Sequence, residues 1–234
     1  MKLRNQGMIL AEDGRKMSKS LGNVVNPDDA VAVFGADSLR IFEMFMGPLE
    51  DAKPWNTQGI VGVKRFLERI WRLQEKITDE DGKSIRSLVQ KTIKKVGDDI
   101  EMMKFNTAIS AMMILVNEAE KIGMTRESYR LFVKILSPFA PHIAEEIWGK
   151  LGNAESVFVS AWPDYDPGLI KDEEINLVVQ VNGKMRDMLK VGADIDQDGA
   201  KAVALESEKI KAYVAGKEIR KIIFVPGKLL NIVV

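Results

Sequence analysis

The chain has 234 residues, and its 34 basic and 34 acidic side chains give a formal net charge of zero, so a polyanionic partner would have to contact local basic patches. It contains no cysteine and one histidine, which excludes disulfides, thiol nucleophiles and the usual zinc-binding spacings. No apolar run approaches the ~18 residues that cross a bilayer, so we expect a globular protein that does not contact a membrane and is either cytoplasmic or a mature organellar protein.

The first predicted element is the end of a strand at 8–10, which leads into a loop rich in lysine, serine and glycine. Two ammonium groups and two small hydroxyl donors are concentrated at Lys16, Met17, Ser18, Lys19 and Ser20. A polyphosphate could lie between the two lysines, because ammonium and hydroxyl groups both bind phosphate oxygens. Asn26 and Pro27 then supply the N-cap and the first residue of a helix. The alternative interpretation is a solvated basic turn.

The pentapeptide KMSKS in this loop is specific, since average residue usage gives a chance of roughly 10⁻⁴ for such a match in a chain of this length. The loop resembles the second signature motif of class I aminoacyl-tRNA synthetases. The resemblance implies that ATP is held by Lys16, Met17, Ser18, Lys19 and Ser20. It also implies that the nucleotide carries the Mg²⁺ and that this chain binds no metal itself. It also implies that Lys16 and Lys19 are catalytic, with Lys19 stabilising the charge that develops as pyrophosphate leaves.

The first signature motif of that family has two histidines separated by two residues, and a chain whose only histidine is His142 cannot contain it. We therefore expect the C-terminal portion of a synthetase, inactive alone, whose amino acid is bound by a missing N-terminal part or a complementary synthetase chain. His142 lies just inside a predicted helix, and no cysteine or second histidine completes a catalytic group with it. We expect it to be structural.

Helical periodicity dominates the next part of the chain. A helix that starts at Pro27 is followed by one over 36–46 that ends at Gly47 and Pro48, and Trp55 is expected to pack in the core. Five more helices are predicted: one marked by apolar residues from Ile60 to Ile77, one from Ile85 to Met103, one capped by Asn106 that ends near Gly123, one from Thr125 to Ser137, and one that begins at Pro141.

The short connections between these helices predict an antiparallel bundle. In sequence the bundle resembles the anticodon-binding domain of the synthetases for leucine, isoleucine, valine and methionine, through FNTAISAMM and PFAPHIAEEIW. Basic side chains that share one helical face recur at Arg65, Arg69, Arg72 and Lys76. They are candidates for tRNA binding through phosphate contacts, weighed evenly against a solvated face supported by Glu68 and Glu75.

From residue 175 the apolar period changes to two, which indicates strands. The pair Asn182 and Gly183 predicts a hairpin, because both residues accept the positive φ angles of a type I′ turn. A helical stretch over 197–214 and a second hairpin around Pro226 complete a small α+β domain with a four-stranded sheet.

Alternation along the second of these strands predicts a basic face. It would place Met185, Leu189 and Val191 on one side, with Asp187 as an exception. The other side would hold Met188 together with three basic residues, Lys184, Arg186 and Lys190. These three are candidates for contacts with tRNA phosphates. The alternative, about equally weighted, is that they are only solvated.

The final sequences, VQVNGKMRDMLKV and IRKIIFVPGKLLNIVV, resemble the C-terminal domain of bacterial-type leucyl-tRNA synthetases, which selects leucine among the four amino acids. The predicted fold is mainly α: a helical bundle preceded by a catalytic-domain remnant with the KMSKS loop and followed by a small α+β domain. The predicted domains are 1–56 (loop and connecting helices), 57–163 (helical anticodon-binding domain), 164–174 (linker) and 175–234 (α+β tRNA-binding domain).

The resemblance implies ATP-dependent leucylation of tRNA(Leu), to which this chain would contribute the loop and tRNA binding. Two alternatives stay open at this point. The chain could be a non-catalytic tRNA- or RNA-binding module or small subunit that retains the loop, or it could belong to an isoleucyl- or valyl-tRNA synthetase.

Overall fold

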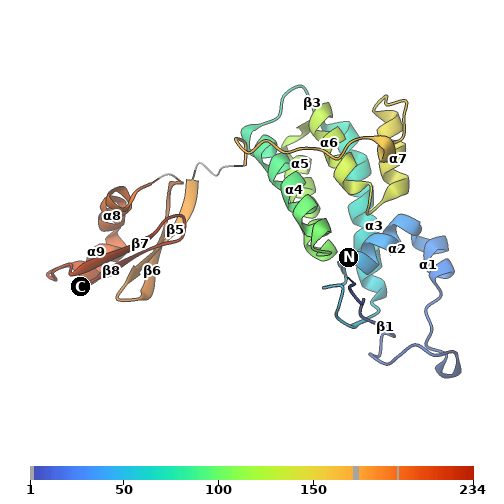
Figure 1. Cartoon of the computed structure of the whole chain (residues 1–234), viewed down its shortest axis with the longest axis horizontal. Coiled ribbons are helices and arrows are strands. Elements are labelled where there is room, and N and C mark those ends of the chain that lie inside the picture. Colours follow the sequence, from blue (N-terminus) through green and yellow to red (C-terminus); the bar gives the residue numbers. More distant parts are fainter. Residues whose placement is uncertain (1–2, 171–173, 194) are drawn as a thin grey trace. The chain divides into compact units, whose positions relative to one another are not determined.

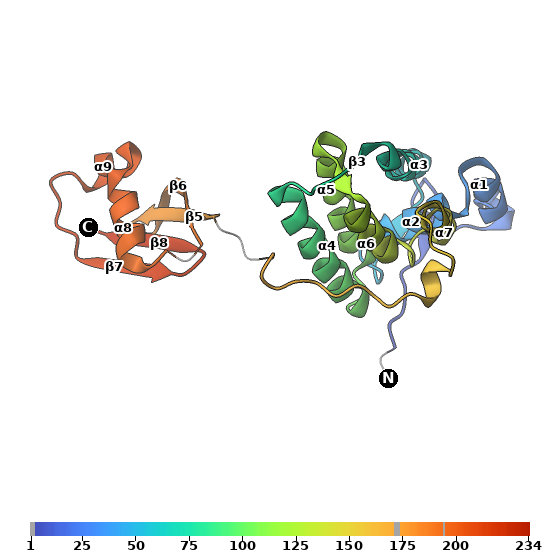
Figure 2. The same cartoon turned by 90° about the horizontal axis from the view of Figure 1, so that it is seen from above.

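The computed structural model describes residues 3–170, 174–193 and 195–234. It divides into a first unit, Met1–Ile170, and a second unit, Lys171–Val234. Figure 1 and Figure 2 show the two units, each of which we describe by itself. No helix in the described ranges has the length and apolar character that a membrane crossing requires.

The first unit is a helical bundle with short extended pieces between its helices. Its elements are β1 (Ile9–Leu10), η1 (Lys19–Leu21), α1 (Pro27–Phe34), α2 (Ala36–Phe45), β2 (Lys53–Pro54), α3 (Thr57–Arg72), η2 (Leu73–Lys76), β3 (Ile77–Thr78), α4 (Lys83–Glu101), α5 (Phe105–Ile122), β4 (Met124–Thr125), α6 (Arg126–Leu136), α7 (Pro141–Lys150) and η3 (Val157–Val159). Helices α4, α5 and α6 lie side by side in both views (Figures 1 and 2). The predicted mainly helical fold is confirmed.

One apolar core runs through this bundle, because each long helix turns a stripe of apolar side chains inward. Trp55 is buried and packs edge-on against Phe42, with 4.9 Å between the ring centroids, so its predicted packing role is confirmed. The fully buried Tyr129 of α6 donates its hydroxyl to the carbonyl oxygen of Ile70 at 2.8 Å, which satisfies the buried polar group and ties α6 to α3. Burial raises the pKa of the Tyr129 phenol, so it remains a neutral donor.

Several predicted helix ends are confirmed by their side-chain caps. Asn26 accepts a hydrogen bond from the backbone N–H of Asp28 at the start of α1, and Thr125 accepts one from Ser128 at the start of α6.

Two expectations about the helices were wrong. The helix marked by Ile60 to Ile77 is not continuous, because α3 ends at Arg72, a 3₁₀ turn follows, and Ile77 pairs with Met124 in the parallel β3–β4 bridge.

The expected cap at Asn106 was also wrong. With Asn106 as the cap, the helix would begin at Thr107, but α5 begins two residues earlier, at Phe105, because Met103 adopts a left-handed conformation with φ 56° and reverses the chain there. The N–H of Lys104 then donates to the carbonyl oxygen of Asp99 at 2.7 Å. The buried Asp99 carboxylate accepts the Thr107 hydroxyl at 2.6 Å, so the α4–α5 turn is closed by Asp99 rather than by Asn106.

The second unit is a four-stranded sheet with two helices. Its elements are β5 (Glu174–Val181), β6 (Lys184–Gly192), α8 (Gln197–Glu206), α9 (Glu208–Val214), β7 (Lys221–Val225) and β8 (Leu229–Val233). The strand order is β6-β5-β8-β7, with β5 and β8 parallel and the two hairpins antiparallel. Asn182 and Gly183 have φ angles of 50° and 76°, so the predicted hairpin turn is confirmed. The predicted helical stretch over 197–214 is interrupted at Ser207.

The two helices cover one face of this sheet (Figure 2). The covered face is apolar and fully buried, at Leu177, Val179, Leu230 and Ile232. The opposite face is open and also carries large apolar side chains, of which Met185 is 55% exposed and Met188 is 51% exposed. The sheet therefore has a closed side that holds the core and an open side on which two large apolar side chains are exposed.

Candidate functional site

The KMSKS loop is entered through a tight turn at the end of β1. The N–H of Ala11 donates to the carbonyl oxygen of Arg15 at 2.8 Å, and the N–H of Gly14 donates to that of Ala11 at 2.9 Å. Gly14 has a φ of 76°, a conformation that side chains other than hydrogen disfavour. A surface ion pair of 2.6 Å joins Arg15 to Asp13 beside this turn. The chain thus leaves β1 in a fixed direction just before Lys16.

Asn23 braces the loop from its far end. Its side-chain oxygen accepts the backbone N–H of Ser18 at 2.8 Å, and its amide nitrogen donates to the carbonyl oxygen of Lys16 at 3.3 Å. The hydroxyls of Ser18 and Ser20 are 2.8 Å apart, within hydrogen-bond distance of each other. Met17 packs against the bundle core as a partly buried side chain. One amide and one apolar anchor therefore shape a loop that is otherwise exposed.

The two loop lysines point into solvent. Lys16 and Lys19 are both exposed, and no side chain or backbone group in the described part of the chain forms a hydrogen bond or ion pair with either ammonium group. Lys19 opens a single 3₁₀ turn, Lys19–Leu21, that ends at Gly22 in a left-handed conformation. The arrangement leaves two positive charges exposed on one short loop, and ammonium groups of this kind bind anions.

The segment before the loop is fastened to the start of α3. The carboxylate of Glu12 accepts the hydroxyl of Thr57 at 2.8 Å and the backbone N–H of the same residue at 3.4 Å. The N–H of Trp55 donates to the carbonyl oxygen of Leu10 at 2.8 Å, and its indole N–H donates to the Thr57 hydroxyl at 3.1 Å. These bonds place the base of the loop at the N-terminus of the helix that carries the predicted basic stripe.

The structure divides that basic stripe into two pairs. Arg69 binds the carboxylate of Glu120 on α5, with its Nη2 2.6 Å from Oε2, and Lys76 donates to the backbone carbonyl oxygen of the same residue. The hydrogen bond raises the pKa of Arg69 and lowers that of Glu120. Arg65 and Arg72 are exposed instead. Two of the four candidates therefore stabilise helix packing, and two face solvent.

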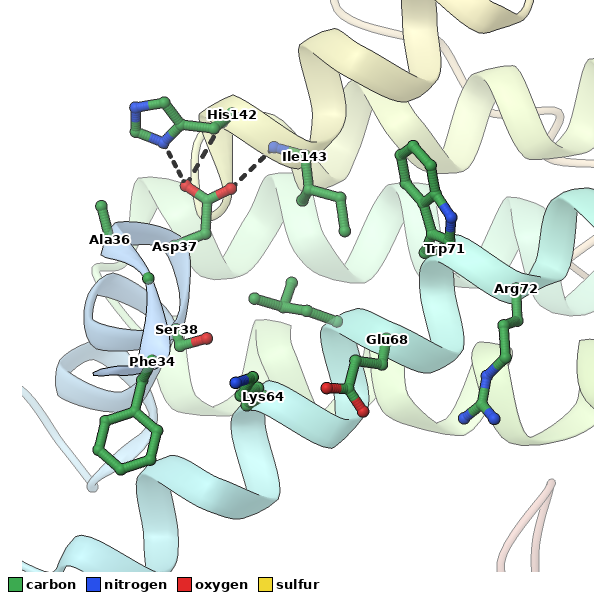
Figure 3. A pocket seen from close by; sticks show the side chains of 12 residues that line it. Phe34, Ala36, Asp37, Ser38, Lys64, Glu68, Trp71, Arg72, His142 and Ile143 are labelled. Atoms are coloured by element: carbon green, nitrogen blue, oxygen red, sulfur yellow. Dashed lines mark hydrogen bonds and ion pairs between the residues drawn. The ribbon is translucent and has the colours of Figure 1, made fainter. Parts of the chain in front are cut away.

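His142 takes part in a helix cap rather than in a catalytic group (Figure 3). The carboxylate of Asp37 accepts the backbone N–H of His142 at 3.3 Å and that of Ile143 at 2.8 Å, at the N-terminus of α7. The His142 Nδ1 lies 2.8 Å from the same carboxylate. Among the described residues, no group of three His, Asp or Glu side chains could hold a metal ion.

The predicted basic face on β6 was wrong, because the strand contains a bulge. Val179 pairs with Asp187 and Gln180 pairs with Met185, so Arg186 is an additional residue that breaks the alternation. The guanidinium of Arg186 stacks on Tyr213 of α9, with its central carbon 4.0 Å from the ring centroid.

The three basic candidates on β6 therefore do not share one face. Arg186 points to the side of the sheet that α9 covers. Lys184 pairs with the buried Val181, whereas Lys190 pairs with Asn176 on the open side, and directly paired residues lie on the same face. Asp187, the exception in the sequence pattern, faces the helices and accepts hydrogen bonds from Ser207 at 2.6 Å and Lys209 at 3.1 Å, which lower its pKa.

Comparison with known proteins identifies the family. Residues 2–56, which include the loop, match the family described as tRNA synthetases class I (I, L, M and V). Residues 82–203, more than half of the chain, match the anticodon-binding domain of tRNA ligase. The chain belongs to the class I tRNA synthetases.

A solved structure supports this assignment across both units. The crystal structure of the ternary complex of Agrobacterium radiobacter K84 agnB2 LeuRS with tRNA and LeuAMS matches 98% of this chain, with 30% sequence identity and a TM-score of 0.85. The match covers 33% of that LeuRS, so this synthetase chain spans about a third of its length.

Sequence reasoning missed two residues that shape the loop of this synthetase. Asn23 follows Gly22, and an asparagine next to a glycine is a turn signal that could have indicated a side chain bonded to local backbone. Glu12 gave no comparable signal, because its partner Thr57 lies 45 residues away along the chain.

Proposed function

We propose that this chain is part of a leucine–tRNA ligase and contributes a phosphate-binding loop and tRNA-binding surfaces to ATP-dependent leucylation of tRNA(Leu). The observation that carries the proposal is the loop itself, in which Lys16 and Lys19 are exposed and unpaired on a backbone braced by Asn23. The likeness to a LeuRS over 98% of the chain, including the small α+β unit, favours leucine over isoleucine or valine.

The loop is suited to the first step of the reaction, in which the carboxylate of leucine attacks the α-phosphorus of ATP. The bond from the α-phosphorus to the bridging oxygen breaks, and pyrophosphate leaves with the electron pair. Negative charge grows on the departing phosphates, and a positioned ammonium group such as that of Lys19 stabilises it. Lys16 and the hydroxyls of Ser18 and Ser20 would hold the phosphates in place. The Mg²⁺ that accompanies ATP would arrive with the nucleotide.

The second step transfers the leucyl group to tRNA, and we assign the RNA contacts mainly to the first unit. Arg65 and Arg72 are exposed on α3, where they can contact phosphates without reading bases. Arg69 and Lys76 would act indirectly, by fixing α3 against α5. Leucine would be bound by a separate N-terminal portion that carries the two-histidine motif, and the assembled enzyme would act in the cytoplasm.

Leucine-dependent exchange of ³²P between pyrophosphate and ATP tests this proposal. We expect no exchange by the chain alone and restored exchange after it is mixed with an N-terminal portion of a leucyl-tRNA synthetase. Isoleucine or valine in place of leucine is the matched control for amino-acid specificity. Exchange that depends on isoleucine or valine would contradict the leucine assignment. A chain that binds tRNA but never restores exchange would support the non-catalytic RNA-binding module instead.

A further inference from the structure

A cavity of about 590 Å³ lies in the first unit, and none of the KMSKS residues lines it. Part of its wall is formed by residues 6–9, which lead through β1 toward the loop, and part by residues 43–49 at the end of α2 and in the turn that follows. Lys53 of β2 and Phe105, the first residue of α5, also line it. The volume lies in the range of sites that bind small molecules, and the reaction described above assigns no role to this cavity.

Apolar side chains form much of the lining, and methionine is prominent among them. Met44 and Met46 are half-buried, and Met8 is 49% exposed. Ile9 and the half-buried ring of Phe105 add further apolar surface. Methionine side chains are flexible and polarisable, so they adapt to ligands of different shape. A lining of this kind suits the apolar stem of a ligand.

Three charged side chains also line the cavity, and two of them pair with each other. The Nζ of Lys53 lies 3.1 Å from the Oδ2 of Asp51. No hydrogen bond or ion pair joins the third, Glu43, to another residue in the described part of the chain. Arg40, three positions earlier on α2, donates to the carbonyl oxygen of Pro138 at 2.9 Å. The cavity therefore holds one carboxylate that has no donor.

The surroundings of the Glu43 carboxylate favour a cation. Desolvation by the surrounding protein raises the pKa of this carboxyl group, and the positive charge of Arg40 offsets part of that effect. A carboxylate that loses water contacts without gaining a donor is destabilised. A ligand that brings a positive charge and N–H donors would remove this cost, because hydrogen bonds between two ionised groups are the strongest of their kind.

Other classes of ligand fit these side chains less well. A phosphate or carboxylate would be repelled by Glu43, and Lys53, the lysine in the lining, is already paired with Asp51. A neutral apolar molecule would displace water from Glu43 and supply no donor in return. A hydrated metal ion would leave the apolar lining unused. An amine on an apolar stem satisfies both the carboxylate and the methionines.

We propose that this cavity binds a primary ammonium group carried on an apolar stem. The ammonium group donates to the carboxylate of Glu43, and the stem packs against Met44, Met46 and Phe105. Two sources supply this chemistry: a free aliphatic amine, or a lysine side chain of the N-terminal portion of the synthetase. The site shares no residue with the ATP- and tRNA-binding groups proposed above, so it stands or falls independently of them.

Titration of the full chain with n-hexylammonium chloride, followed by NMR of ¹³C-labelled methionine methyl groups, tests the site. The signals of Met44 and Met46 should shift, and that of Met112, which is buried in the bundle core, should not. Each methylene added between n-butylammonium and n-hexylammonium should strengthen binding by up to about fourfold, because the apolar stem leaves water. The alcohol 1-hexanol has the same stem without the charge and should bind more weakly than n-hexylammonium.

Glu43→Gln should weaken the binding of n-hexylammonium about 5- to 30-fold, the lower part of the range for a hydrogen bond between charged groups, because Glu43 is partly exposed. The same variant should bind 1-hexanol as the wild type does. Glu50→Gln is the matched control, since Glu50 is an exposed carboxylate of the same segment that does not line the cavity. Circular dichroism melting verifies that each variant folds.

Two outcomes overturn the proposal: n-hexylammonium binds the wild type no more tightly than 1-hexanol does, or it binds Glu43→Gln as tightly as the wild type. Once binding is established, competition identifies the source of the ammonium group. Displacement of n-hexylammonium by an N-terminal portion of a leucyl-tRNA synthetase supports a lysine side chain as the occupant, whereas simultaneous binding of both supports a free amine.

Discussion

Replacement of Asn23 by alanine tests whether one side chain gives the KMSKS loop its shape. The variant loses two hydrogen bonds, a short one of 2.8 Å to the N–H of Ser18 and a longer one of 3.3 Å to the carbonyl oxygen of Lys16. A hydrogen bond contributes about 0.5 to 1.5 kcal/mol net, and the longer, exposed bond belongs at the lower end. We therefore expect the loop conformation to lose about 1 to 2 kcal/mol.

Hydrogen exchange of the Ser18 amide measures this loss directly. A loss of that size corresponds to opening that is about 5 to 30 times more frequent, so Ser18 should exchange faster by this factor. The melting temperature should hardly change, because neither bond reaches the bundle core. Asn23→Asp is the matched control: it keeps the acceptor for Ser18, loses the donor to Lys16 and should give an intermediate rate. Unchanged exchange at Ser18 in Asn23→Ala would refute the idea that this side chain braces the loop.

Three further predictions address catalysis, stability and RNA binding. In the enzyme formed by mixing this chain with the N-terminal portion, Lys19→Ala should lower the single-turnover rate of leucyl-adenylate formation about 10²- to 10³-fold, with a smaller effect on leucine binding. An unchanged rate would show that Lys19 does not act on the transition state. Because Arg69 lowers the pKa of Glu120 from its ordinary value of 4.5, the ionised carboxylate stabilises the fold above that value, and this contribution is lost as the pH falls through the lowered pKa. Urea unfolding from roughly pH 5 to pH 3 should therefore show a steeper fall in stability for the wild type than for Glu120→Gln, and parallel curves would contradict the pair. The double variant Arg65→Gln/Arg72→Gln should weaken tRNA binding and flatten its dependence on log salt by about 0.7 to 0.9 per lost phosphate contact, whereas an unaltered slope would mean that both side chains are only solvated.

Local sequence signals predicted most of the fold. The helices follow from apolar periodicity, the starts of α1 and α6 from Asn26 and Thr125, and the β5–β6 hairpin from the Asn182–Gly183 pair. Each of these depends on interactions within a few residues of the chain, where intrinsic preferences and the fold agree. The KMSKS motif is also contiguous, so it could be identified from the sequence, and the phosphate-binding role of its residues stays a prediction.

The remaining features depend on partners that are far apart in sequence. The pairing of Arg69 with Glu120 joins residues 51 positions apart, so the helical spacing of the basic stripe could not reveal which of its members face another helix. The pocket lined by Phe34, Trp71 and Ile143 combines residues of α1, α2, α3 and α7, which meet only in the folded chain. Asn106 failed as a cap because Met103, a residue rarely found in the left-handed conformation, reverses the chain first.

The bulge in β6 changes how the second unit could meet RNA. It turns Arg186 and Asp187 toward α9, where Asp187 accepts the hydroxyl of Ser207 at the start of that helix, so both charges serve the fold. The open face of the sheet carries exposed methionines, with Lys190 as the one of the three basic candidates on β6 that lies on this side. A face of this kind would contact flat base surfaces or sugars rather than a row of phosphates, and such contacts release few counterions. The salt dependence of tRNA binding should therefore arise mainly from the exposed arginines of α3.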